Sequence, residues 1–237
     1  MPLAQAVLIF ALSNGFALPA TAAFLAGPPG SGLTARETLW EVPVGPAVGL
    51  FLLLAAVDHL LVAAPGVWSW YRDNLRRGIN HARWWEYSVS ASVMVVLIAL
   101  ITGVSDVGAI IAIFGANAAM IFFGCVMELV NRPGRAVNWT PFLLGCVIGV
   151  VPWLVIAYQF NGAADRSPDG GGPPAFVYAI VVSLFVLFNS VAASMVLQYK
   201  RVGPWRSYLF GDAAYVVLSL TAKTALAWQV FANTLVG

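Results

Sequence analysis

The chain has 237 residues, of which 60% are hydrophobic and only 9% charged, and its formal net charge is +2. Soluble domains carry about 25% charged residues, so this composition excludes a water-soluble globular protein and makes lipid the solvent for most of the chain. No basic run is dense enough to indicate nucleic-acid binding.

Apolar windows long enough to cross a membrane recur along the whole sequence. A spanning helix needs about 20 predominantly apolar residues, and these runs are too long and continuous for the strands of a membrane barrel. The sequence therefore predicts an all-α, multi-pass protein of the cell membrane, a single domain over residues 1–237 with seven transmembrane helices. The windows cover residues 3–26, 44–64, 84–104, 107–129, 140–160, 174–199 and 213–235.

The first window has no basic flank and is followed by six more, so it is a poor signal peptide. Met1-Pro2 leads straight into apolar sequence. Two alternatives stay open: a short first helix, or a chain that lacks residues at its start. In the long connector after it, Thr34 to Val44 has extended character and predicts a small hairpin, which Pro43 disfavours.

The basic residues of the connectors predict an orientation, because they mark the cytoplasmic side of a membrane protein. The connectors after the second, fourth and sixth windows hold nine of them: Arg72, Arg76, Arg77, Arg83, Arg132, Arg135, Lys200, Arg201 and Arg206. The opposite connectors hold only two, Arg36 and Arg166, beside the acids Glu37, Glu41, Asp106, Asp165 and Asp169. We therefore expect a cytoplasmic amino terminus and an extracellular carboxyl terminus.

Ionisable residues inside a span cost about 2.5–3.5 kcal/mol or more, and each is a functional candidate by default. Asp58 and His59 lie in the second window, Glu86 early in the third and Lys223 midway along the seventh. Two further acids, Glu128 and Asp212, stand at the ends of windows, where we expect snorkelling or headgroup contact to satisfy them.

Lys223 is the strongest of these signals, because it lies about ten residues from either end of its window. Ser219 precedes it by one helical turn on the same face. An amine buried in apolar surroundings is a nucleophile toward aldehydes and favours a Schiff base, whose protonated form needs a nearby anion. Glu86 is the obvious candidate for that anion.

Other interpretations of these charges stay open at this point. Lys223 and Glu86 could form a structural ion pair or the coupling site of a transporter. His59 could equally be a core histidine bonded to a backbone carbonyl. Because neighbouring helical residues point about 100° apart, Asp58 and His59 cannot both face one partner squarely.

Aromatic and small residues supply weaker signals. The motif Gly145-xxx-Gly149 fits close helix approach, within the bundle or in a dimer. Cys125 and Cys146 are expected as small core residues, since a disulfide framework or metal site would need more ligands at closer spacing. Aromatic residues near the ends of windows are expected as interfacial anchors: Trp68, Trp70, Trp84, Trp85, Tyr87, Trp139 and Trp205.

Several long motifs, in order over essentially the whole chain, resemble the heliorhodopsins. Arg83–Met94 is similar to their third-helix signature, Asn117–Glu128 to the fourth helix and Val151–Trp153 to the fifth. Phe176–Tyr178 and Leu187–Asn189 resemble the sixth helix, and the segment around Lys223 resembles the retinal-binding seventh. The inverted orientation predicted from the charges is also typical of this family.

The resemblance implies a rhodopsin-like bundle that binds all-trans retinal as a Schiff base on Lys223, with Glu86 as its sole carboxylate counterion. It also implies a homodimer whose contact includes the first external loop. Ser219 and Ser90 would tune the pair by hydrogen bonding. The remaining residues implied are Asn117, Met120, Trp153 and Phe188, which would line the chromophore, and His59, with Asp58 beside it, in a buried polar cluster toward the cytoplasm.

The sequence departs from the family pattern in two places. The family's first helix begins earlier and contributes a second histidine to the polar cluster, and Asp58 beside His59 is unusual for the family. Both departures concern the proton-accepting cluster and leave the chromophore residues untouched.

The residues favour a light sensor over a pump. A proton pump typically has a second carboxylate one turn before the lysine, and Ser219 occupies that position here. We therefore predict a photoreceptor that signals to a cytoplasmic partner near Arg72, Arg76 and Arg77, and that is not an enzyme, because no nucleophile–base pair or metal cluster is evident. The alternatives are a light-driven proton transporter or channel, which Asp58 would support, and a light-dependent regulator of a partner enzyme.

Overall fold

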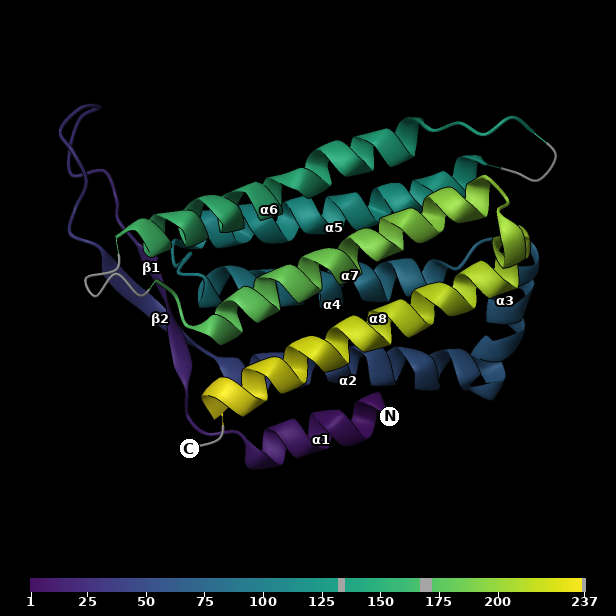
Figure 1. Cartoon of the computed structure of the whole chain (residues 1–237), viewed down its shortest axis with the longest axis horizontal. Coiled ribbons are helices and arrows are strands. Elements are labelled where there is room, and N and C mark those ends of the chain that lie inside the picture. Colours follow the sequence, from purple (N-terminus) through teal and green to yellow (C-terminus); the bar gives the residue numbers. More distant parts are fainter. Residues whose placement is uncertain (132–134, 167–171, 236–237) are drawn as a thin grey trace.

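The computed structural model describes residues 1–131, 135–166 and 172–235 as a bundle of helices that run side by side (Figure 1). Within these ranges, six helices are long and apolar enough to cross a membrane, the last of them continued by a π-helical turn, η2 (Phe231–Leu235). The predicted multi-pass architecture is thereby confirmed. The six are α2 (Val44–Ala63), α4 (His81–Ile101), α5 (Val107–Val130), α6 (Thr140–Asp165), α7 (Ala175–Tyr199) and α8 (Tyr208–Val230).

The first predicted span, residues 3–26, is wrong in its extent. Helix α1 covers only Pro2–Leu12, 11 residues, or about 16 Å at the helical rise, about half the ~30 Å thickness of the hydrocarbon layer. Figure 1 shows α1 beside α2, with the amino terminus partway along the bundle. The helix gives way at Ser13-Asn14-Gly15, where the Asn14 side chain accepts a hydrogen bond from the Phe16 N–H at 3.0 Å.

The apolar residues after α1 form a strand, β1 (Ala17–Ala22), and not helix. It pairs antiparallel with β2 (Glu37–Pro43), so that Ala17 lies opposite Pro43. The extended conformation predicted within Thr34–Val44 is confirmed by β2. The strand that pairs with β2 is β1, which comes from residues predicted as helix. Thr21 fastens the sheet to the α4–α5 connector, since its N–H donates to the Ser105 carbonyl at 2.7 Å.

The other end of the bundle carries two helices that the apolar windows did not predict. A single residue, Ala64, separates α2 from helix α3 (Pro65–Arg76). Figure 1 shows α3 lying across the end of the bundle remote from the hairpin. A short 3₁₀ helix, η1 (Gly203–Arg206), joins α7 to α8 at this same end.

Most of the connector basic residues counted for the orientation do lie at the α3 end. Arg83 also lies toward that end, but it belongs to α4 and not to a connector, and it is only 3% exposed. Its assignment to a connector was wrong, since α4 begins earlier, at His81, than the predicted window. Arg132 and Asp169, which also entered the count, lie outside the described residues.

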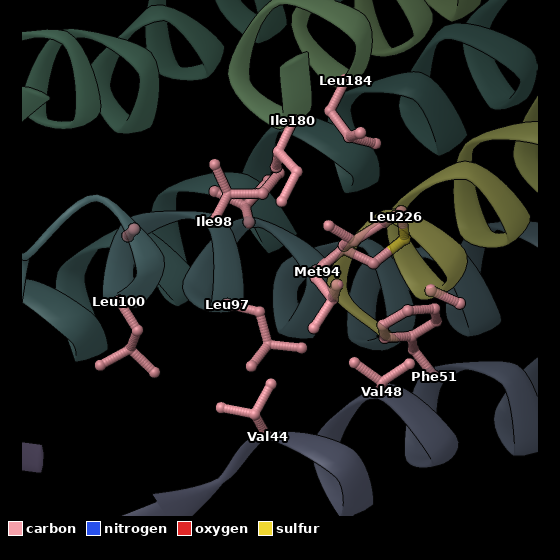
Figure 2. Close-up of a cluster of buried hydrophobic side chains, with 14 of the residues drawn as sticks. Val44, Val48, Phe51, Met94, Leu97, Ile98, Leu100, Ile180, Leu184 and Leu226 are labelled. Atoms are coloured by element: carbon pink, nitrogen blue, oxygen red, sulfur yellow. The ribbon is translucent and has the colours of Figure 1, made fainter. Parts of the chain in front are cut away.

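The main core joins α2, α4, α7 and α8 toward the hairpin side of the bundle (Figure 2). Phe51, Met94, Ile98, Leu184 and Leu226 are each at most 2% exposed and come from these four helices. Lipid tails are as apolar as these side chains, so close packing and not exclusion from water must hold the helices together. Helix α4 is the most enclosed of the spans, which makes it the element on which a buried site depends.

Small residues allow α5 and α6 to approach closely. A Cβ added at Gly149 would lie 2.3 Å from the Met120 sulfur, and one at Gly145 would lie 3.2 Å from the Phe123 Cβ. The Gly145-xxx-Gly149 motif therefore serves contact within the bundle. Cys125 and Cys146 are both free thiols, and the prediction that both are core residues is wrong for Cys146, which is exposed on α6.

Gly124→Ala is expected to destabilise the bundle, because the new Cβ would lie 2.4 Å from the buried Trp84 ring. Overpacking of this kind costs about 1–3 kcal/mol. Thermal unfolding of the purified protein measures the loss. Gly115→Ala on the same helix is the matched control, since nothing lies within 4 Å of its added Cβ. Equal melting temperatures for the two variants would contradict the packing described between α4 and α5.

Candidate functional site

Lys223 and Glu86 form an ion pair in the interior of the bundle. The Lys223 Nζ on α8 donates to the Glu86 Oε1 on α4 at 2.7 Å, and the two side chains are 2% and 7% exposed. The Nζ also lies 5.1 Å from the centroid of the Tyr87 ring, where the ring face attracts a cation. Either charge alone would be costly in lipid, so the pair is the arrangement that allows both.

Lys223 is the one lysine of this chain placed to react inside the bundle. The sequence contains a single other lysine, Lys200, and this residue is exposed just after α7. A lysine amine removed from water is activated for condensation with an aldehyde. Because Lys223 is the buried one of the two lysines, a Schiff base inside the bundle is expected at this residue.

Two serines stand one helical turn from the two charged residues. Ser90, four residues after Glu86, is fully buried, and its hydroxyl has no hydrogen-bond partner among the described residues. Ser219, four residues before Lys223, lies half-buried beside the Tyr87 hydroxyl. Buried hydroxyls are normally hydrogen-bonded, so the unpaired Ser90 Oγ is a polar atom whose bonding capacity the described residues leave unused.

Asn117 links α5 to α4 close to this pair. It is 1% exposed, and its Nδ2 donates to the Ser92 hydroxyl at 3.0 Å, which in turn donates to the Ser88 carbonyl at 2.7 Å. Met120, one turn later on α5, fills the space left by Gly149 of α6. Asn117 thus contacts α4, and Met120 contacts α6, inside the bundle.

Trp153 and Phe188 come together between α6 and α7. Their ring centroids lie 5.8 Å apart at an interplanar angle of 80°, and Phe185 approaches the same indole at 5.1 Å. Trp153 and Phe188 both pack against the main core. The structure therefore joins these two predicted residues to each other, with edge-to-face contacts typical of aromatic pairs.

Asp58 and His59 lie half-buried on α2. The Asp58 carboxyl group and the His59 imidazole both lie within electrostatic range of Glu86 and Lys223. Helix α2 therefore brings two further titratable groups to the ion pair, although neither makes a direct hydrogen bond among the described residues.

A second buried ionic cluster, which the sequence did not predict, lies toward the α3 end. The Arg83 guanidinium donates to Glu128 of α5 at 2.5 Å and to the Asp212 carboxylate of α8. The three residues are 3%, 4% and 6% exposed. We call Arg83, Glu128 and Asp212 the charge clasp. It contains one cation and two carboxylates, so its formal charge is −1.

Hydrogen bonds and aromatic rings surround the clasp, and among its buried polar atoms the Arg83 Nε has no hydrogen-bond partner within the described residues. The Glu128 carboxylate accepts from the Trp84 indole at 2.6 Å, from the Tyr208 hydroxyl at 3.2 Å and from the Asn80 N–H at 3.0 Å. The Arg83 guanidinium lies 4.5 Å from the centroid of the Trp84 ring and 4.3 Å from that of Tyr215. These contacts hold the starts of α4 and α8 against the end of α5.

Two predictions are wrong in this region of the bundle. Glu128 and Asp212 do not reach out to headgroups, because Arg83 lies between them and satisfies both in the interior. Trp84 and Tyr87 are not interfacial anchors, since they are 2% and 8% exposed. The interfacial assignment does suit Trp85, Trp68 and Trp70, at 65%, 49% and 47% exposed.

Helical spacing was the signal that could have revealed the clasp. Asp212, Tyr215, Ser219 and Lys223 follow one another at intervals of three or four residues and so share one face of α8. Arg83 likewise precedes Glu86 by three residues on α4. The face that bears the ion pair therefore also bears the clasp.

These features define a class of protein: a multi-pass membrane bundle with a rhodopsin-like fold and a buried lysine on its last helix. The crystal structure of a light-driven proton pump LR (Mac) from Leptosphaeria maculans is similar, with a TM-score of 0.65, over 98% of this chain and 90% of that chain. The two sequences are only 14% identical, so this likeness shows the fold alone. None of the curated proteins matches the chain.

The heliorhodopsin family model matches residues 1–235, essentially the whole chain. The chain belongs to the heliorhodopsin family, which confirms the resemblance found in the sequence motifs. This is a family of photoreceptor-type membrane proteins and not a classical family of enzymes, and membership implies a retinal chromophore.

The residues of the bundle fit such a chromophore. Retinal is an aldehyde, and the one buried amine of the described chain is Lys223, already beside a carboxylate. The unpaired Ser90 hydroxyl, one turn from Glu86, is available to a polar group at this place. The rings of Trp153 and Phe188 offer apolar walls of the kind that a polyene requires.

Variants that remove one charge from the clasp should lose stability in proportion to the net charge that each leaves buried without a partner. Arg83→Gln leaves two buried carboxylates without a cation and should cost about 3–5 kcal/mol. Asp212→Asn leaves the neutral Arg83–Glu128 pair and should cost clearly less. The melting temperature of the purified protein measures both. If Asp212→Asn destabilises the protein as much as Arg83→Gln, the clasp does not have the charge balance described.

Proposed function

We propose that the protein is a light sensor in which Lys223 binds all-trans retinal as a protonated Schiff base and Glu86 is its counterion. The observation that carries the proposal is the 2.7 Å ion pair between these two buried side chains in a chain of the heliorhodopsin family. Desolvation makes the Lys223 amine reactive toward an aldehyde, and the Glu86 carboxylate stabilises the cation that results.

The surrounding residues would orient and isolate the pair. Ser90 and Ser219 can donate hydrogen bonds next to the charges, from one turn along α4 and one turn along α8. Asn117, Met120, Trp153 and Phe188 would line the chromophore and exclude water from it. Retinal, when bound, supplies absorption of visible light and a change of shape on isomerisation.

The response to light would begin at the contact between Lys223 and Glu86. The proton held between them in the dark can pass to the polar groups that α2 brings close, His59 and Asp58. Because α8 bears both Lys223 and Asp212, a displacement of this helix at Lys223 would act on the charge clasp. The clasp ties α8 to α4 and α5, so the signal would reach the α3 end of the bundle.

A sensor is favoured over a pump because the vectorial relay is incomplete. Ser219 stands one turn before Lys223, where pumps typically have a second carboxylate, and Ser219 cannot hold the proton as an acid. Beyond Glu86, α4 presents Ser90 on the same face, a hydroxyl and not an acid. A proton released at Lys223 would therefore stay with the polar groups near the ion pair, His59 and Asp58.

The topology proposed from the charges places the α3 end in the cytoplasm and the hairpin outside the cell. The whole of residues 1–237 would form a single domain, with α1 as the seventh helix of the bundle. A homodimer that uses the external hairpin follows from the family resemblance. A partner in the cytoplasm would meet the α3 end, near Arg72, Arg76 and Arg77, and such a partner could be an enzyme that the light signal regulates.

A light-driven proton transporter or channel is the second candidate, and Asp58 is the observation that favours it. A carboxyl group close to Lys223 and Glu86 could extend a proton path along α2 toward the α3 end.

Reconstitution with all-trans retinal should give a coloured pigment in the unchanged protein and none in Lys223→Ala, because the variant lacks the buried amine. Glu86→Gln should shift the visible band to the red, since the cation loses its anion. Absorption spectroscopy of the purified proteins measures both effects. An unshifted band in Glu86→Gln would mean that another group is the counterion.

A sensor and a proton transporter differ in whether illumination changes the pH of the medium around the cells. Illumination of cells that express the protein with retinal should leave the pH of an unbuffered suspension unchanged, and cells that express Lys223→Ala are the control without a pigment. A light-dependent pH change that an uncoupler abolishes and that Asp58→Asn lacks would establish the transporter instead.

A further inference from the structure

The outer flank of α3 combines aromatic and basic side chains in one stripe. Trp68, Arg72 and Arg76 follow at intervals of four residues and therefore share one side of the helix. Trp68 is 49% exposed, and the side chains of Arg72 and Arg76 are 43% and 70% exposed. The opposite side is held by the bundle, since Asn74 is 4% exposed and Trp70 stacks on His81 of α4 with ring centroids 6.3 Å apart.

The position of α3 puts this stripe at the boundary between lipid and water. The helix lies across the end of a bundle whose neighbouring helices cross the membrane (Figure 1), so its axis runs along the membrane surface. Tryptophan prefers the headgroup level, and arginine extends from there toward water or phosphate. A helix of this kind lies in the interface with its apolar side in lipid.

The two arginines of the stripe share a single acid. The Asp73 carboxylate oxygen Oδ1 lies 3.1 Å from Arg72 and 3.6 Å from Arg76. One carboxylate facing two guanidinium groups leaves a net charge of +1 beside Trp68, and the exposed guanidinium edges retain N–H donors. Arginine binds phosphate through such forked donors.

We propose that Trp68, Arg72 and Arg76 form a binding site for an anionic phospholipid. The lipid phosphate would lie between the two guanidinium groups, and the acyl chains would lie along the Trp68 ring. Asp73 competes with the phosphate for both arginines and so weakens the site. The proposal does not depend on retinal or on signalling, and it can be tested in the dark.

The test compares phosphatidylglycerol with phosphatidylcholine of the same acyl chains, added to the purified full-length protein in detergent. Native mass spectrometry counts the bound lipids at each concentration. The unchanged protein should prefer phosphatidylglycerol, and each of Arg72→Gln and Arg76→Gln should reduce that preference by roughly fivefold, from the contribution of one basic residue near anionic lipid.

Two further variants distinguish this site from general charge attraction. Asp73→Asn removes the competing carboxylate and should strengthen phosphatidylglycerol binding, the opposite direction from the arginine variants. Arg36→Gln is the matched control, because Arg36 is an exposed arginine in the connector at the hairpin end, and it should leave the preference unchanged. An unaltered melting temperature checks that each variant is folded, and the 70% exposure of the Arg76 side chain makes Arg76→Gln the variant least expected to disturb the fold.

The proposal is overturned if the unchanged protein binds both lipids equally, or if Arg36→Gln lowers the preference as much as Arg76→Gln. Weaker binding in Asp73→Asn would also contradict it. Glycerol phosphate, the headgroup without acyl chains, should bind far more weakly than the lipid. Equal affinity would mean that the site takes a free phosphate and not a membrane lipid.

Discussion

The ion pair between Lys223 and Glu86 is the constraint on which the rest of this structure depends. An ammonium group and a carboxylate each cost several kcal/mol inside a membrane, and their contact compensates both charges. Their contact in turn requires α8 and α4 to lie side by side with a fixed register. Contacts that hold α4 against α8 therefore also fix the position of Glu86 relative to Lys223.

The charge clasp repeats the same principle at the α3 end of the bundle, with the signs exchanged. Helix α4 presents the cation Arg83 and then the anion Glu86, whereas α8 presents the anion Asp212 and then the cation Lys223. Between the two pairs, the Tyr87 hydroxyl of α4 donates to the Tyr215 carbonyl of α8 at 2.9 Å. A shift of one helix against the other would disturb both ionic contacts, and this coupling gives the proposed signal a physical route.

The sequence predicts the contact between Lys223 and Glu86 because charges are conspicuous in apolar windows. Lys223 and Glu86 stand out for this reason, and helical spacing places Ser219 and Ser90 beside them. The clasp is hidden because Arg83, Glu128 and Asp212 fall at the edges of windows, where solvation outside the bundle is the simpler expectation. Only the packing of three helices reveals that one arginine joins both acids.

The errors in secondary structure have similar physical causes. Apolar composition cannot distinguish the strand Ala17–Ala22 from a continuation of α1, because both environments accept such residues. Helix α3 is amphipathic and too short to be found by a search for spans, although its four-residue spacing of Trp68, Arg72 and Arg76 is visible. The likeness to a proton pump at 14% identity adds a further lesson: the fold is shared, and function depends on the side chains placed within it.

The most direct test of the central claim is to locate the bond to the chromophore. Borohydride reduces a Schiff base to a stable amine, so the retinal-reconstituted protein can be reduced, digested and mapped by mass spectrometry. The account predicts a single retinyl adduct, on the peptide that contains Lys223. An adduct on Lys200 or on the amino terminus, or the absence of any adduct, would contradict it.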